Sequence, residues 1–282
     1  MAQKVPQTTV DRLASVVPEN LAPGGVPVYV GEEPGGIELY RWGSLVMRLP
    51  ATDRASAGIE NEYRWIERAT GDLVRVGIAV PTPRFRGAPT RSFERPWLLV
   101  NGTDGAALAE VPITERGRIA RDLAVGLAAL HAEAPDDAPQ RLVLKSQRNA
   151  FEEHVRGRPQ EERLRELFVR GVVAKPWSAA PIWCHGALVP HGLVTSAGRL
   201  KAMTGFGGLH AGDPAIDYAA FHLGFTAQQT SHARVVLRAL AAADDDALWL
   251  RARAWAAYVV ARLLADGDPH GVDALRLLTA DT

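Results

Sequence analysis

The chain has 282 residues, a length that suits one domain or two closely packed lobes. Its 32 basic and 32 acidic residues give a formal net charge of zero, so no overall charge draws it to nucleic acid or to anionic membrane. Cys184 is the only cysteine, which excludes an intrachain disulfide and a cysteine-cluster zinc site and is typical of a reducing cytoplasm.

The sequence carries no signal for insertion into a membrane. The N-terminal residues lack the apolar stretch of a signal peptide, and no run approaches the roughly 20 apolar residues of a membrane span. We therefore expect a cytoplasmic protein with no membrane partner and no nucleic-acid partner. Lysine occurs only four times, so arginine supplies 28 of the 32 basic residues, as is typical of a GC-rich genome.

The first hundred residues predict a β-rich segment that contains one helix. Short apolar runs broken by glycine are typical of strands. Ile59, Tyr63 and Ile66 lie at helical spacing with charges between them, which predicts a helix over 53–70. The expected strands are Val26–Val30, Ile37–Trp42, Leu45–Leu49, Val74–Val80 and Pro96–Val100, with a turn at Gly31–Gly36.

Asn101–Gly105 is the strongest linker signal, and the pattern beyond it becomes helical. Helices are expected over 113–132, 149–172, 213–225 and 231–266, the last with a turn at Asp244–Asp246. Short strands are expected at Pro181–Cys184, Leu193–Thr195 and Leu200–Thr204. The pattern therefore predicts an α+β protein with a β-rich lobe at 1–101 and a mostly helical lobe at 102–282.

One stretch, from His185 to Ala219, carries three motifs in order. It contains HGALVPHG at 185–192, GFGG at 205–208 and GDPAID at 212–217. This resembles the catalytic core of the aminoglycoside/macrolide phosphotransferases, which are relatives of the protein kinases and typically show HGDLHPGN, a DFG-like triplet and GDPAxD. The resemblance implies a bilobal kinase-like fold and transfer of a phosphoryl group from a nucleotide to a small-molecule hydroxyl.

The resemblance extends into the first lobe. Arg48 matches the base that faces the nucleotide phosphates in the family, and Glu62 matches the helix glutamate that pairs with it. Leu99 and Val100 lie on the segment that leads to the adenine-contacting hinge, and Pro34–Ile37 matches the loop over the phosphates. These positions imply contact with ATP or GTP. The alternative is that Arg48 and Glu62 form an ion pair with no nucleotide bound.

The chain departs from the family where the chemistry is done. Ala187, Gly192 and Gly205 stand in place of the loop aspartate, the loop asparagine and the metal-binding aspartate. Because alanine and glycine side chains have no lone pairs, they neither accept a proton nor coordinate Mg²⁺. Loss of a general base alone costs on the order of 10²–10⁴ in rate.

The sequence thus predicts a catalytically inactive, pseudokinase-like protein that binds a small molecule or a protein partner. No cofactor is expected, and ATP or GTP would bind without the usual Mg²⁺ site. The alternative is an active phosphotransferase whose missing oxygens come from Glu32, Glu33 or Asp104. A third hypothesis is an unrelated reaction in the same cleft with His191 or His210 as the base.

Four further residues are candidates to line the cleft, namely His185, His191, Lys201 and His210. The resemblance makes His185 a structural residue of the loop. His191 and His210 would bind a metal or an anion, or are exposed loop histidines. Lys201 would bind a phosphate, or is a solvated hairpin lysine.

Two acids and the lone cysteine receive a structural interpretation. Asp213 precedes Pro214 and is typical of a helix start. The resemblance implies that Asp217 braces the catalytic loop through backbone hydrogen bonds. Cys184 ends an apolar strand and is interpreted as a core residue rather than a nucleophile. No metal site is predicted.

Overall fold

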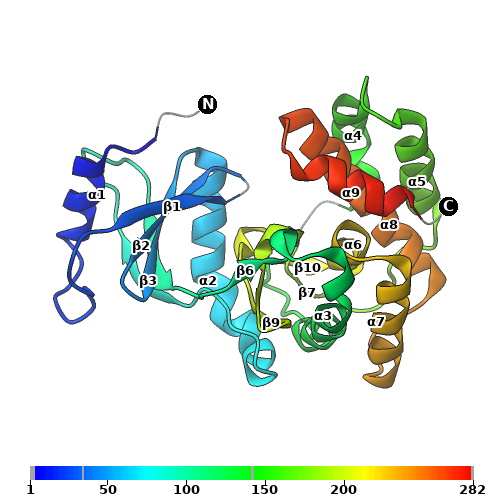
Figure 1. Cartoon of the computed structure of the whole chain (residues 1–282), viewed down its shortest axis with the longest axis horizontal. Coiled ribbons are helices and arrows are strands. Elements are labelled where there is room, and N and C mark those ends of the chain that lie inside the picture. The colour runs from blue at the N-terminus through cyan, green and yellow to red at the C-terminus, as the bar shows by residue number, and fades with distance from the viewer. Residues whose placement is uncertain (1–3, 34, 141–142, 281–282) are drawn as a thin grey trace.

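A computed structural model describes residues 4–33, 35–140 and 143–280. The first part is a five-stranded antiparallel sheet between two helices, and the second part is mainly helical (Figure 1). The predicted α+β class is therefore confirmed. The elements of the first part are α1 (Gln7–Ala14), β1 (Val28–Glu33), β2 (Ile37–Trp42), β3 (Leu45–Pro50), α2 (Asp53–Arg75), β4 (Pro83–Gly87) and β5 (Trp97–Asn101).

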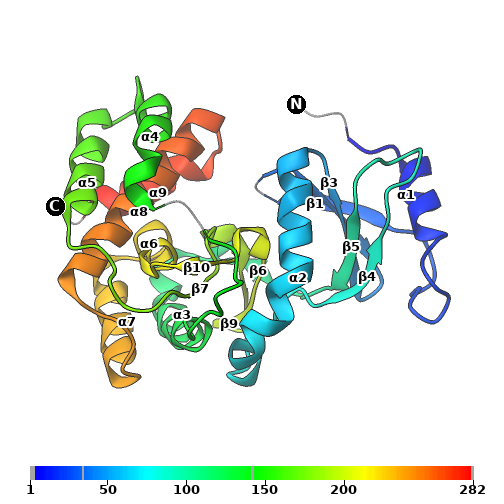
Figure 2. The same cartoon turned by 180° about the vertical axis from the view of Figure 1, so that it is seen from behind.

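The sheet separates two small cores because successive side chains of a strand point to opposite faces. In the order β1-β2-β3-β5-β4, strand β5 lies inside the sheet. Its Leu99 packs with Val10 of α1 on one face, whereas Leu98 and Val100 pack with Ile59 of α2 on the other. Helix α2 is thereby held on the face of the sheet that looks toward the second part (Figure 2).

Helix α2 is longer than predicted, and the prediction of a strand over Val74–Val80 is wrong. Ile66 and Leu73 are both buried and are seven residues apart, so the apolar face of the helix continues to its end. The valines that suggested a strand lie at and beyond the exposed end of the helix. Beyond the helix, Ala79 makes only an isolated bridge with Ala202.

Strand β1 continues into the turn predicted at Gly31–Gly36 and ends at Glu33, so the first half of that range is strand instead of turn. Its register with β2 shifts between Tyr29 and Gly31, which is a β-bulge. Pro34 is the first residue of the segment that matches the family's loop over the phosphates, and it lies outside the described residues. The structure also contains α1 and β4, which the sequence analysis did not predict.

The second part contains two small sheets and seven α-helices within the described residues. Strands β6, β8 and β9 form one sheet, and β7 and β10 pair antiparallel as the other. The elements are β6 (Ala106–Ala107), α3 (Gly117–Leu130), α4 (Arg148–Val155), α5 (Glu161–Val173), β7 (Ile182–Cys184), β8 (Leu193–Ser196), β9 (Arg199–Met203), β10 (His210–Gly212), α6 (Ala215–Gly224), α7 (Ala227–Ala239), α8 (Asp246–Asp266) and α9 (His270–Thr279).

Helix α8 is the centre of this part and packs against α4, α5, α6 and α9. It is buried nearly all round, with residues such as Leu248, Ala252 and Val260 at 0% exposure, as expected of a helix enclosed by others. The helix predicted over 149–172 is instead two helices, α4 and α5, because Gly157 adopts a positive φ of 69° between them. Helix α9 was not predicted.

The two parts are joined by a short crossing and by helix α2. Strand β5 ends at Asn101, and β6 pairs with β8 of the second part, so the chain crosses between them. The side chain of Asn61 on α2 donates to the carbonyl oxygens of Gly207 at 3.3 Å and Leu209 at 2.8 Å. Helix α2 therefore contacts both the sheet and the GFGG segment. Within the described ranges, no helix is long and apolar enough to cross a membrane.

The contact between α5 and α8 should be intolerant of one added methyl group. A Cβ on Gly171 would lie 2.3 Å from the Cβ of Ala254 and 2.7 Å from the carbonyl oxygen of Leu250. We expect Gly171→Ala to lower the free energy of unfolding by about 1–3 kcal/mol, since overpacking outweighs the gain in helix propensity. The matched control is Gly71→Ala on α2, where nothing lies within 4 Å and the same change should stabilise. Urea denaturation of both variants tests this, and equal effects would contradict it.

Candidate functional site

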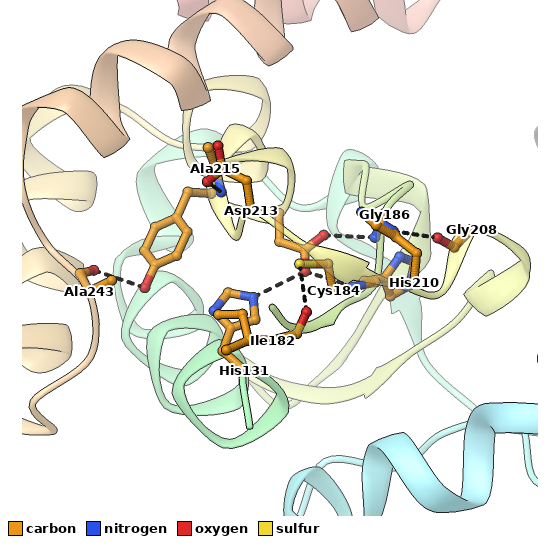
Figure 3. A network of polar contacts seen from close by, with 12 residues as sticks. His131, Ile182, Cys184, Gly186, Gly208, His210, Asp213, Ala215 and Ala243 are labelled. Carbon is orange, nitrogen blue, oxygen red and sulfur yellow. Dashed lines mark hydrogen bonds and ion pairs between the residues drawn. The ribbon is translucent and has the colours of Figure 1, made fainter. Parts of the chain in front are cut away.

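The loop at 185–192 is held in place by one buried carboxylate, that of Asp217 on α6. Asp217 is 0% exposed. It accepts hydrogen bonds from the backbone N–H of His185 at 2.7 Å and of Gly186 at 2.8 Å, and its Oδ2 lies 3.1 Å from His131 Nε2 (Figure 3). Burial opposes ionisation, but the hydrogen bond and charge of His131, with smaller contributions from His185 and Gly186, hold the pKa of Asp217 below its usual value.

His185 links the two degenerate segments. Its Nε2 lies 2.9 Å from the carbonyl oxygen of Thr204, and the Ala187 N–H donates to its Nδ1 at 3.4 Å. The ring also packs on Phe206, with centroids 4.3 Å apart. The side chain is fully buried. His185 thus connects the loop to the GFGG segment and is not placed to act as a base on an incoming ligand.

The three substituted positions lie on these connected segments. The carbonyl oxygen of Gly192 accepts a hydrogen bond from the Thr204 N–H at 2.8 Å, so Gly192 lies beside Gly205. Ala187 is exposed, and its N–H contacts the His185 ring that also contacts Thr204. Gly205 has φ 82° with nothing within 4 Å of an added Cβ. The structure therefore brings the three positions together without a side-chain oxygen among them.

Mg²⁺, which the family resemblance implies, does not fit these residues. It requires several oxygen ligands, and these positions offer only a methyl group and backbone. In the part of the chain that the structure describes, no group of three or more His, Cys, Asp or Glu side chains could hold a metal ion.

Arg48 on β3 forms a buried cluster with two carboxylates. One of its terminal nitrogens, Nη1, donates to Glu62 of α2, as the resemblance implies, and the other, Nη2, lies 2.6 Å from Glu33 Oε2. Arg48 and Glu62 are 1% and 0% exposed. Burial raises the pKa of Glu62 to about 7, an effect that Arg48 opposes and Glu33 strengthens. The charges of Glu33 and Glu62 outweigh burial and raise the pKa of Arg48.

Leu99 and Val100, the other predicted nucleotide contacts, lie inside the sheet. Their side chains are 0% and 2% exposed and belong to the two cores described above. Their backbones lie between β3 and β4. The buried side chains of Leu99 and Val100 pack in the protein interior, so the prediction that these two residues contact a nucleotide stays a prediction about the segment and its backbone.

The remaining histidines occupy different surroundings. His210, on β10, is only 6% exposed, and its Nδ1 lies 2.9 Å from the carbonyl oxygen of Gly208. Its interpretation as an exposed loop histidine is therefore wrong. His191 is half-buried against His270 of α9, with ring centroids 3.8 Å apart. Burial and the neighbouring His270 lower the pKa of His191.

Lys201, Asp213 and Cys184 lie apart from the Arg48 cluster. Lys201 on β9 is exposed. Asp213 binds the guanidinium of Arg251 through both oxygens, at 2.7 and 3.1 Å. It also accepts a hydrogen bond from the Ala215 N–H at 3.0 Å (Figure 3). It lies two residues before the start of α6, whose N-cap is Pro214. Cys184 is fully buried at the end of β7.

Two contacts of the site were not predicted from the sequence. The first is the pairing of His131 with Asp217. The available signal was a histidine near the end of the helix predicted over 113–132. The second is the orientation of Glu33 toward Arg48, for which the sequence gives no signal. Two surface hollows of about 440 and 330 Å³ lie elsewhere, beside Trp183 and beside Trp42 respectively.

Known proteins resemble this chain in sequence motif and in fold. A model of a phosphotransferase enzyme family matches residues 32–258. The GDP and kanamycin complex of APH(2")-IIia shares 19% identity over 97% of each chain, with a TM-score of 0.68. The apoenzyme of macrolide 2'-phosphotransferase MphH from Brachybacterium faecium shares 17% identity over 98% of this chain and 99% of its own, with a TM-score of 0.67.

A third solved structure, the streptomycin–ATP complex of APH(2")-IIa, shares 15% identity over 98% of this chain and 99% of its own, with a TM-score of 0.60. A comparison with curated proteins found no match. At these identities the solved structures establish the fold, which is that of the aminoglycoside phosphotransferases. The matched range covers most of the sequence and includes both Arg48 and the loop that Asp217 holds. The chain therefore belongs to the phosphotransferase enzyme family.

Proposed function

We propose that this protein is a catalytically silent member of its family that acts by binding a small molecule or a protein partner. The observation that carries the proposal is the composition of the site at Ala187, Gly192 and Gly205. These neighbouring positions offer no side-chain oxygen, whereas phosphoryl transfer relies on a group that accepts or orients the nucleophile and on metal ions that neutralise charge.

The contacts that hold this site are present, which favours a binding role. Asp217 still holds the loop through two backbone hydrogen bonds, and Arg48 is still paired with Glu62. A loop kept in a defined shape can present a surface to a ligand without supplying a base or a metal ion. We expect the ligand to occupy the space beside Ala187 and Gly205, where an added Cβ at Gly205 meets nothing.

The alternative of relocated carboxylates gains no support from the three acids proposed for it. The Glu33 carboxylate is hydrogen-bonded to Arg48 at 2.6 Å rather than directed at Ala187 or Gly205. Asp104 is 96% exposed and pairs with Arg41 at 3.3 Å. Glu32 is exposed on β1.

A turnover assay tests the proposal. The protein would be incubated with ATP or GTP, with and without Mg²⁺, and with kanamycin, streptomycin or a macrolide as acceptor, and phosphorylated product would be followed by mass spectrometry. An active family member in the same assay is the positive control. We expect no Mg²⁺-dependent product above background. Turnover in the range of about 1–100 s⁻¹, which is ordinary for kinases, would overturn the proposal.

A thermal-shift titration with the same nucleotides adds a binding readout. A ligand at 100 times its dissociation constant stabilises the folded state by about 2.7 kcal/mol. A shift that requires Mg²⁺ would indicate that some group replaces the missing ligands and would favour the active alternative. A shift without Mg²⁺ would support a nucleotide-binding protein, and no shift would direct the search to other small molecules and to protein partners.

A further inference from the structure

The cluster around Arg48 contains one more carboxylate than the guanidinium balances. Arg48 carries one positive charge, and Glu33 and Glu62 would carry two negative charges when ionised. Within the described residues, Arg48 Nε and Glu62 Oε2 are buried without a hydrogen-bond partner. Unpaired buried polar atoms are costly, so the cluster leaves part of its hydrogen-bonding capacity unused.

The two carboxylates are held very differently. Glu62 lies within the 23-residue helix α2 and is 0% exposed. Glu33 is the last residue of β1, an edge strand whose one neighbour among the described strands is β2, and its side chain is 16% exposed. Ends of edge strands have few hydrogen bonds to break and open at low free-energy cost. Glu33 is therefore the replaceable partner of Arg48, and Glu62 is the fixed one.

The contact that Glu33 makes is one that any oxyanion can make. Its Oε2 accepts a charge-assisted hydrogen bond from Arg48 Nη2 at 2.6 Å. Guanidinium groups bind carboxylate and phosphate oxygens with the same donor geometry. Because Glu33 is the more exposed of the two carboxylates, its departure would leave a buried donor facing the solvent side of the cluster.

We infer that Arg48 is a latent oxyanion site that Glu33 occupies as an intramolecular ligand, and that a phosphate group binds there only when Glu33 is displaced or neutralised. This inference rests on the proposed function, because it assumes that the protein binds a ligand without transferring a phosphoryl group. The phosphate could belong to a nucleotide or be free phosphate, and the chemistry at Arg48 is the same for both.

Equilibrium binding without Mg²⁺ and without an acceptor tests the inference separately from turnover. ADP, inorganic phosphate and adenosine would each be titrated by calorimetry into the wild type, Glu33→Gln and Glu32→Gln. Glu32→Gln is the matched control, because Glu32 is the adjacent residue, is exposed and undergoes the same change of charge. Thermal melting of each variant would verify folding, with Glu33→Ala as a second variant.

We expect Glu33→Gln to bind ADP at least about tenfold more tightly than the wild type, because a like charge beside the incoming phosphate has been removed. Glu32→Gln and adenosine should show no gain, and adding Arg48→Met to Glu33→Gln should abolish it. A gain for ADP alone would identify a nucleotide phosphate as the ligand, and a gain for both anions would identify phosphate itself. Equal affinities of the wild type and both Glu33 variants, or an equal gain in Glu32→Gln, would overturn the inference.

Discussion

Asp217→Ala should lower the free energy of unfolding by about 3–5 kcal/mol. The substitution would leave the His185 and Gly186 N–H groups buried without their acceptor and would remove the partner of His131. Urea denaturation measures the loss. Asp217→Asn, which keeps one acceptor oxygen, should lose less.

The control for this prediction is an acid that pairs at the surface. Asp137 is 71% exposed and lies 3.4 Å from Arg68, so Asp137→Ala should change stability little. Because the pKa of Asp217 lies below its usual value, its contribution is present at neutral pH and is lost as the pH falls through its folded-state pKa. If Asp217→Ala were as stable as Asp137→Ala, the bracing role of Asp217 would be refuted.

Arg48→Met should also be strongly destabilising, and its cost should depend on pH. Removing the guanidinium leaves Glu62 buried without its counter-charge, which costs about 3–5 kcal/mol when the carboxylate is ionised. The pKa of Glu62 is already raised to about 7 and would rise further without Arg48, which lowers it. A carboxylate whose folded-state pKa is raised stabilises the fold at low pH and loses that contribution as the pH rises.

We therefore expect the penalty of Arg48→Met to be smallest near about pH 5 and to grow toward about pH 8. Thermal melting over this range measures it, within the range where the wild type remains folded. Adding Glu62→Gln should remove most of the growth with pH, because the buried charge is then absent. A penalty that is equal at both pH values, with no effect of Glu62→Gln, would show that Glu62 does not titrate in this range.

The sequence predicted the centre of the sheet well and its periphery poorly. Strand β2 begins and ends as predicted at Ile37 and Trp42, since alternating apolar residues and the glycine turn define a hairpin locally. Strand β4 was missed because Arg84 and Arg86 interrupt its apolar pattern at an exposed edge. Valines at the end of α2 suggested a strand, because β-branched residues favour strands when no tertiary contact is visible.

The site was predictable where it depends on spacing and unpredictable where it depends on side-chain direction. The motif order placed Asp217 beside the loop and Arg48 opposite Glu62, because these pairings come with the fold. Whether Glu32 or Glu33 points inward could not be read from alternation. The β-bulge between Tyr29 and Gly31 shifts the period of two, and only the structure fixes the bulge.

The left-handed backbone at Gly205 bears on which residues this position can hold. At φ 82° a residue with a Cβ is strained by roughly 1–2 kcal/mol, and glycine relieves that strain. Gly205→Ala should therefore be less stable than the wild type even though the added methyl group meets nothing, because the strain is in the backbone. The backbone at this position thus favours glycine for the shape of the chain alone, whatever chemistry the neighbouring loop carries.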